Sequence, residues 1–193
     1  MTPGPAGASS GAGSGADPGK GGDRSGRSAT RLAIVVAAIA LLLDVVSKHL
    51  AVRELTGRPP VDVVGELLQL RLVRNPGAAF SAGASLTPVI SVVALVAALV
   101  VAFYALRVRH RVWALALGLL LAGVTGNLID RLFRAPGPFR GHVVDFFALP
   151  HWPVFNVADI CIDLAGALFV VLLLRGVPLD GTRREHDAQR DER

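Results

Sequence analysis

Four long apolar stretches limit what this chain can fold into more than any other feature of its sequence. They lie at residues 32–52, 89–106, 112–129 and 157–174. Each is close to the ~20 residues that an α-helix needs to cross the hydrocarbon core of a bilayer. The sequence therefore predicts four membrane-spanning helices.

Composition agrees with a membrane class and sets the domain boundaries. The chain is 52% hydrophobic and 18% charged, which leaves too little polar surface for a water-soluble domain. Residues 1–30 are rich in Gly, Ser, Ala and Pro, and residues 176–193 are polar and charged. We expect a disordered N-terminal tail at 1–30, a transmembrane domain at 31–175 and a disordered C-terminal tail at 176–193.

The connections between the stretches predict the topology. The first long connection contains Leu68-Gln-Leu-Arg-Leu72, whose alternation predicts a half-buried strand. We therefore expect an all-α integral membrane fold of four transmembrane helices, with a small extracytoplasmic β-sheet in the first long loop. An even number of helices places both tails on one side. Basic residues near the tails and the short turn at 107–111 favour the cytoplasm for that side.

The formal net charge of +5 does not indicate a nucleic-acid partner. The basic residues stand beside apolar runs, as they do where a protein contacts lipid headgroups, and do not alternate with aromatic residues. We expect membrane lipid as a partner and no nucleic acid.

Polar residues within or beside the apolar stretches are the candidates for chemistry. Asp44 and Lys48 stand four residues apart on one helix face, which favours an ion pair. Asn127 and Asp130 share a face of the third stretch, and Arg131 follows directly. We interpret Asp130 and Arg131 as a structural clamp at a helix end.

Two further motifs combine a local structural role with a possible functional one. Asn75-Pro-Gly77 is a strong turn signal, because Pro fixes φ and Gly allows positive φ. Its Asn75 amide is also suited to contacting an extended peptide. Asn156 and Asp159 have the spacing of a helix N-cap and its N3 partner, which would also fix Asp159 in place for catalysis.

Asp145 has the least ordinary surroundings, because it stands between two valines and two phenylalanines. Desolvation there would disfavour its charged form. Asp145 and Asp159, each beside a membrane span, are the parts of an aspartic protease dyad in which two carboxyl groups share one proton. Neither the acid nor the base role can be assigned to one member.

Other readings stay open at this point. A proton or ion carrier would use Asp44, Asp130 and Asp159 as a relay across the bilayer, and a purely structural bundle would use none of them. The histidines lack zinc-binding spacing. We expect no metal and no cofactor.

Five motifs in order make the chain resemble the bacterial lipoprotein signal peptidases, or signal peptidase II. They are Asp44-Val-Val-Ser-Lys48, Asn75-Pro-Gly-Ala-Ala-Phe80, Gly126-Asn127-Leu-Ile-Asp130-Arg131, Val143-Val-Asp145-Phe146 and Phe155-Asn156-Val-Ala-Asp159. The resemblance implies an intramembrane aspartic endopeptidase that removes the signal peptide of diacylglyceryl-modified prolipoproteins by cleaving before the lipidated cysteine.

The resemblance also implies roles for individual residues. The catalytic dyad falls on Asp145 and Asp159. Substrate-binding or supporting positions fall on Asp44, Lys48, Asn75, Gly77, Asn127, Asp130, Arg131 and Asn156. We expect a monomer in the cell inner membrane, with both termini cytoplasmic and the active site near the extracytoplasmic face. Asp163 lies one turn after Asp159 and outside the pattern, so its role as a like charge or as a Lys48 partner stays open.

Overall fold

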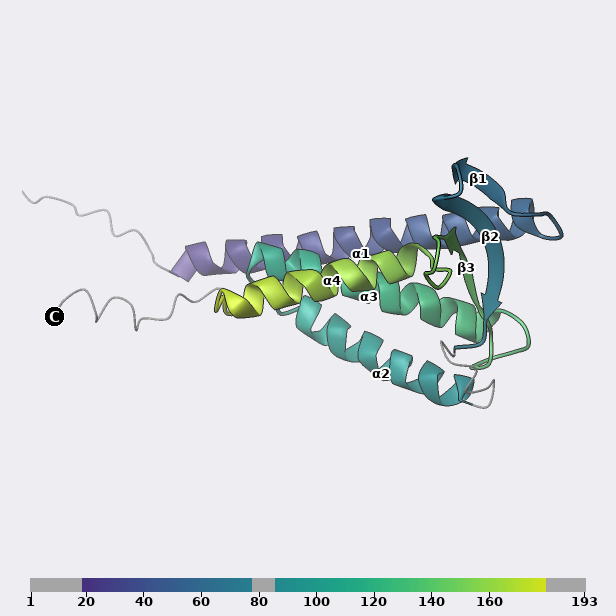
Figure 1. Cartoon of the computed structure of the whole chain (residues 1–193). Coiled ribbons are helices and arrows are strands. Elements are labelled where there is room, and N and C mark those ends of the chain that lie inside the picture. The colour runs from purple at the N-terminus through teal and green to yellow at the C-terminus, as the bar shows by residue number, and fades with distance from the viewer. Residues whose placement is uncertain (1–18, 78–85, 180–193) are drawn as a thin grey trace, which may run out of the picture.

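Four helices form an elongated bundle, and a small sheet lies at one end of it (Figure 1). The computed structural model describes residues 19–77 and 86–179, with side chains from residue 26 onward. The helices are α1 (Gly19–Leu55), α2 (Thr87–Ala105), α3 (Arg111–Phe133) and α4 (Val157–Leu174). The strands are β1 (Val61–Val64), β2 (Leu68–Asn75) and β3 (Val143–Ala148).

All four helices are long and apolar enough to cross a membrane, which confirms the predicted class of fold. Helix α3 is the central one, because half of its apolar window is buried against 17% to 28% in the others. Two glycines allow its neighbours to come close. A Cβ at Gly118 would lie 2.7 Å from the Ala33 carbonyl oxygen of α1, and one at Gly123 would lie 2.5 Å from that of Ala158 in α4.

The sheet is antiparallel with the strand order β1-β2-β3. Strand β2 contains the predicted alternating segment, but β3 comes from the second long connection, where no strand was predicted. Five of the six β3 residues are buried, and a strand covered on both faces lacks the alternation that reveals strands in sequence. Val144 and Phe146 pack on Ala51 and Leu55, which fixes the sheet on the end of α1.

Described structure extends beyond residues 31–175 at both ends. Helix α1 begins at Gly19, so residues 19–30 are helical, and buried Ala29 packs on the core. At the other end, the Val177 carbonyl accepts a hydrogen bond from Trp113 Nε1 at 2.9 Å. Such tertiary contacts stabilise segments for which composition alone predicts no ordered structure. The rest of the predicted tails, residues 1–18 and 180–193, lies outside the described residues.

Candidate active site

A buried lysine gathers two acids from different helices. Lys48 Nζ lies 2.9 Å from Asp44 Oδ2 and 3.0 Å from Asp130 Oδ2, and it donates to Asn127 Oδ1 at 2.9 Å. Asp44 and Lys48 are each 1% exposed. The ion pair predicted between these two residues is therefore confirmed, and Asp130 joins it.

Both acids also have further partners. The backbone N–H of Ala158 donates to Asp44 Oδ1 at 2.8 Å, and that of Val144 donates to Asp130 Oδ2 at 3.2 Å. Arg134 Nε forms an ion pair with Asp130 Oδ1. We call Asp44, Lys48, Asp130 and Arg134 the Lys48 cluster. Its two negative charges face two positive ones, which is the balance that a buried ionic group requires.

The predicted clamp between Asp130 and Arg131 is wrong. Neighbouring residues on a helix point about 100° apart, so Asp130 pairs with Arg134 one turn on. Arg131 instead reaches the Pro76 carbonyl oxygen, 3.5 Å from its Nη1. Gly77 makes room for it: its φ is +109°, and a Cβ there would lie 2.8 Å from Arg131 Nη1.

Asp145 and Asp159, which we call the carboxylate pair, are held by amide groups. Asn75 Nδ2 donates to Asp145 Oδ2 at 3.0 Å, and Asn156 Nδ2 donates to Asp145 Oδ1 at 2.6 Å. Asp159 Oδ1 accepts from Asn127 Nδ2 at 2.9 Å, and its Oδ2 accepts from the Asn156 backbone N–H at 3.1 Å. The two predicted catalytic acids therefore belong to one hydrogen-bond network.

Local structure explains how this network is positioned. Asn156 is fully buried as the N-cap of α4, and it forms the predicted capping box with Asp159. Asn75 ends β2, and its Oδ1 accepts from the Gly77 N–H at 2.8 Å, which closes the predicted turn. The β2–β3 register pairs Val73 with Asp145. That register brings the end of β2 beside the acid on β3.

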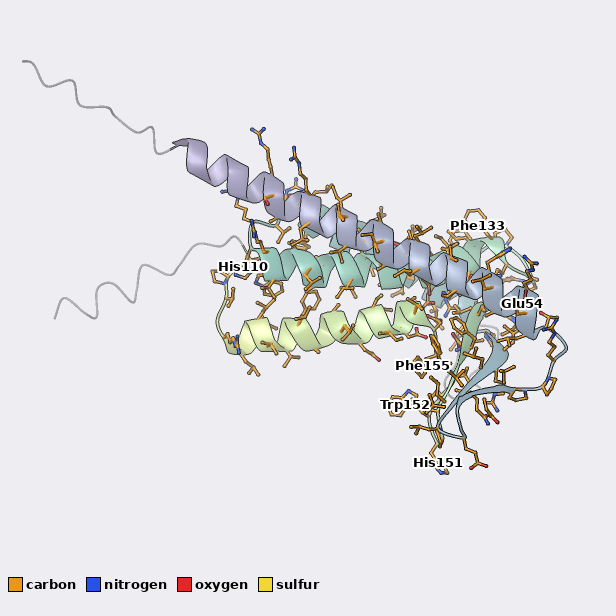
Figure 2. The ribbon with its side chains drawn as sticks, turned by 90° about the horizontal axis from the view of Figure 1, so that it is seen from above. Glu54, His110, Phe133, His151, Trp152 and Phe155 are labelled. Atoms are coloured by element: carbon orange, nitrogen blue, oxygen red, sulfur yellow. The ribbon has the colours of Figure 1, made fainter. Side chains whose placement is uncertain are left out.

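The carboxylate pair opens onto a pocket of about 330 Å³. Its wall includes Trp152, Phe155 and Ile160, and also Asp163, which is exposed. Figure 2 shows Trp152 and Phe155 beside the start of α4, well away from Glu54 at the end of α1.

Lys48 has its partners in the Lys48 cluster, and Asp163 is not among the ion pairs of the described residues. Of its two suggested roles, the pairing with Lys48 is therefore wrong.

The surroundings of Asp145 change its protonation. Burial, the largest effect, raises the pKa of Asp145 from 3.8 to about 6, and the nearby charge of Asp159 acts in the same direction. Hydrogen bonds from Asn75 and Asn156 and the charge of Lys48 lower the pKa and limit the rise. In the described part of the chain no basic side chain forms an ion pair with either member of the pair.

The structure brings all ten predicted site residues into one region at the sheet end of the bundle. Sequence reasoning missed Arg134, although its spacing of four from Asp130 on one helix was a usable signal. It also missed the pocket wall of Trp152, Phe155 and Ile160. No local pattern marks these residues, because they meet only where the third connection folds back on α4.

These features define a membrane-spanning four-helix protein with a paired-carboxylate site at one end of the bundle. The family model for signal peptidase (SPase) II matches residues 36–175. The chain belongs to this family, and it is a multi-pass bacterial membrane protein.

Similar proteins support the assignment. The chain is 50% identical over 156 residues to a lipoprotein signal peptidase of Mycolicibacterium smegmatis, covering 80% of this chain and 66% of the relative. It is 48% identical over 147 residues to one of Streptomyces griseus, covering 76% and 75%. A bacterial membrane enzyme solved at 1.9 Å shares the fold with a TM-score of 0.65 and 23% identity, covering 74% of this chain and 92% of that one.

Proposed function

We propose that the chain is an aspartic endopeptidase that removes the signal peptide of diacylglyceryl-modified prolipoproteins by cleaving before the lipidated cysteine. Family membership supports the removal of prolipoprotein signal peptides. The observation that carries the aspartic mechanism is the carboxylate pair, joined through Asn156 and facing one pocket.

The electrostatics of the pair favour a shared proton. Two carboxylates held close together without a paired cation cannot both ionise easily. A carboxyl group with a pKa of about 6, such as that of Asp145, keeps part of its proton near neutral pH. One member takes a proton from a water that attacks the amide carbonyl, and the other donates a proton to the carbonyl oxygen.

The amides around the pair supply orientation. Asn75, Asn127 and Asn156 hold all four carboxylate oxygens, so the acids need little reorganisation when the substrate arrives. Arg131 lines the same pocket without an ion pair to either acid. We assign it and Gly77 to shaping the substrate site.

The pocket also suits a substrate that stays in the membrane. Its rim contains Trp152, 63% exposed, and Ile160, 37% exposed, at the start of α4. A lipidated peptide can then present its amide to the pair while its acyl chains stay in the bilayer. We propose a monomer in the cell inner membrane with cytoplasmic termini and an extracytoplasmic active site, as the arginines at the tail end support.

Cleavage of a purified diacylglyceryl-modified prolipoprotein in detergent tests the mechanism. We expect Asp145→Asn and Asp159→Asn each to reduce the rate by about a thousandfold, the scale of lost proton transfer. Asp62→Asn is the matched control, since Asp62 is an exposed carboxylate on β1 that accepts a hydrogen bond from Gln69 Nε2 at 2.7 Å. Cleavage that persists in both site variants would refute the dyad.

The proton-carrier alternative is not favoured. Two of its three acids, Asp44 and Asp130, are ion-paired with buried Lys48, and a relay needs groups that can exchange protons along a path.

A further inference from the structure

A second and larger pocket lies at the other end of the bundle. Its volume is about 730 Å³, within the range of roughly 300–1,000 Å³ typical of small-molecule sites. It lies between residues 26–31 of α1 and the short connection from α2 to α3. The label on His110 marks this end of the bundle in Figure 2, far from Trp152 and Glu54. The lining residues are Gly26, Arg27, Thr30, Arg31, Leu106, Arg107, Val108 and Arg109.

Arginine is the commonest residue in the described lining of this pocket. Half of its lining residues are arginines, and no described lining residue is acidic. No carboxylate among the described side chains forms an ion pair with Arg31, Arg107 or Arg109. We call this feature the arginine pocket.

The α2–α3 connection is anchored, so its two arginines have defined positions. Val108 is 1% exposed and packs in the same core cluster as Ala29 of α1. Thr30 Oγ1 donates to the Leu106 carbonyl oxygen at 3.4 Å, which ties the connection to α1. A flexible surface loop would lack these two contacts.

The arginine side chains themselves are also placed. The Arg107 guanidinium lies 3.6 Å from the centre of the Phe103 ring and donates to the Phe103 carbonyl oxygen at 3.5 Å. A cation held over an aromatic face keeps its N–H groups available to an anion. The Arg109 side chain runs along α1, with its Cγ 3.5 Å from the position of a Cβ at Gly26.

We propose that the arginine pocket binds the phosphate group of an anionic phospholipid. Guanidinium groups bind phosphate oxygens in a bidentate way, which favours Arg over Lys in such sites. The pocket lies at the end of four membrane-spanning helices, where lipid headgroups meet the protein. A surface arginine that only fixes topology would need no pocket, whereas this pocket has room for a headgroup and arginines from two elements around it. The site is separate from the carboxylate pair and does not depend on the proposed peptidase mechanism.

Lipid retention measured by native mass spectrometry tests this site. The full-length protein is released from detergent containing equal amounts of phosphatidylglycerol and phosphatidylcholine. We expect wild type to retain phosphatidylglycerol preferentially, and the double variant Arg107→Gln, Arg109→Gln to lose about tenfold in that preference. The variant Arg71→Gln, Arg140→Gln is the control, since both residues are exposed at the sheet end and the change in charge is identical.

Two further readouts separate the possible outcomes. Inorganic phosphate added at millimolar concentration should not displace the lipid; displacement, or binding of phosphate alone, would overturn the lipid assignment in favour of a free phosphate site. Equal retention by both double variants would overturn the site itself. Prolipoprotein cleavage in neutral lipid should be unchanged in Arg107→Gln, Arg109→Gln, which confirms that the variant is folded.

Discussion

The Lys48 cluster and the carboxylate pair are neighbours that differ in which groups surround their carboxylates. In the cluster, Asp44 and Asp130 each lie within 3.0 Å of Lys48 Nζ. In the pair, the hydrogen-bond donors to Asp145 and Asp159 among the described residues are all amides. No member of the cluster is among the described residues that line the 330 Å³ pocket, whereas both members of the pair line it.

Asn127 joins the two groups through a single side chain. Its Oδ1 accepts from Lys48, and its Nδ2 donates to Asp159. The Lys48 cluster, whose negative and positive charges balance, stabilises the packing of α1, α3 and the sheet. That packing positions Asp145 and Asp159, whose negative charges have no cation beside them among the described ion pairs. The comparison predicts that changes in the cluster affect mainly stability, and that changes in the pair affect mainly protonation and catalysis.

The largest effect is expected for Lys48→Met. It leaves two buried acids without their shared cation, which should lower the free energy of unfolding by about 3–5 kcal/mol. Unfolding by denaturant in detergent micelles measures this. The control is Arg53→Met on the same helix, where the side chain is 73% exposed and the loss should stay below about 0.5 kcal/mol. An equal loss of unfolding free energy in the two variants would show that the cluster has no structural role.

Much of the cluster was predictable from sequence, because its central pair is local. Asp44 and Lys48 lie one helical turn apart, so spacing alone predicts their contact. The capping box of Asn156 and Asp159 was predictable for the same reason. Asp130 was assigned the wrong arginine because adjacency in sequence was preferred to adjacency on the helix surface.

The carboxylate pair depends on contacts that no local pattern contains. Asn75 meets Asp145 only through the β2–β3 register, and β3 was not predicted because a fully buried strand shows no alternation. The approach of α4 to α3 depends on the space at Gly123, which sequence spacing does not show. The four helices could therefore be predicted, but the hydrogen bonds of Asn127 to both Lys48 and Asp159 could not.

The second prediction concerns pH and the buried Asp145. Because its folded pKa is raised, the folded state binds this proton more tightly than the unfolded chain. Stability from this group therefore falls as pH rises from 3.8 to about 6, and the loss is complete above about 6. At about 1.36 kcal/mol per unit, the loss totals about 3 kcal/mol.

The variant Asp145→Asn lacks this titrating carboxyl group. Comparing its stability with that of wild type therefore separates the effect of Asp145 from that of other titrating groups. Stabilities of wild type and variant are measured from pH 4 to 7, and over this range their difference should change by about 2.4 kcal/mol in favour of the variant. A difference that stays constant over this range would show that Asp145 titrates normally.

The third prediction tests how closely α1 and α3 approach at the cluster. A Cβ at Gly126 would lie far inside contact distance of Asp44 Oδ2 and 3.1 Å from its Cγ. Gly126→Ala should therefore cost about 2 kcal/mol, since the rigid cluster cannot move aside. Gly166→Ala is the control on α4, because nothing lies within 4 Å of its Cβ position. It should be neutral or stabilise by up to about 1 kcal/mol. Two similar melting temperatures would contradict the close approach.

The smallest effect is expected for Asp163, which lines the pocket but belongs to neither group. It is exposed, so Asp163→Asn should change the unfolding free energy by less than about 0.5 kcal/mol. Its charge lies one turn beyond Asp159, and removing a like charge eases ionisation of nearby acids. We expect the pH–activity profile of Asp163→Asn to move toward lower pH by about half a unit or less. Asp163→Glu keeps the charge and should leave the profile in place. An unshifted profile in Asp163→Asn would mean that burial and the groups nearest to the carboxylate pair, and not the charge of Asp163, set its protonation.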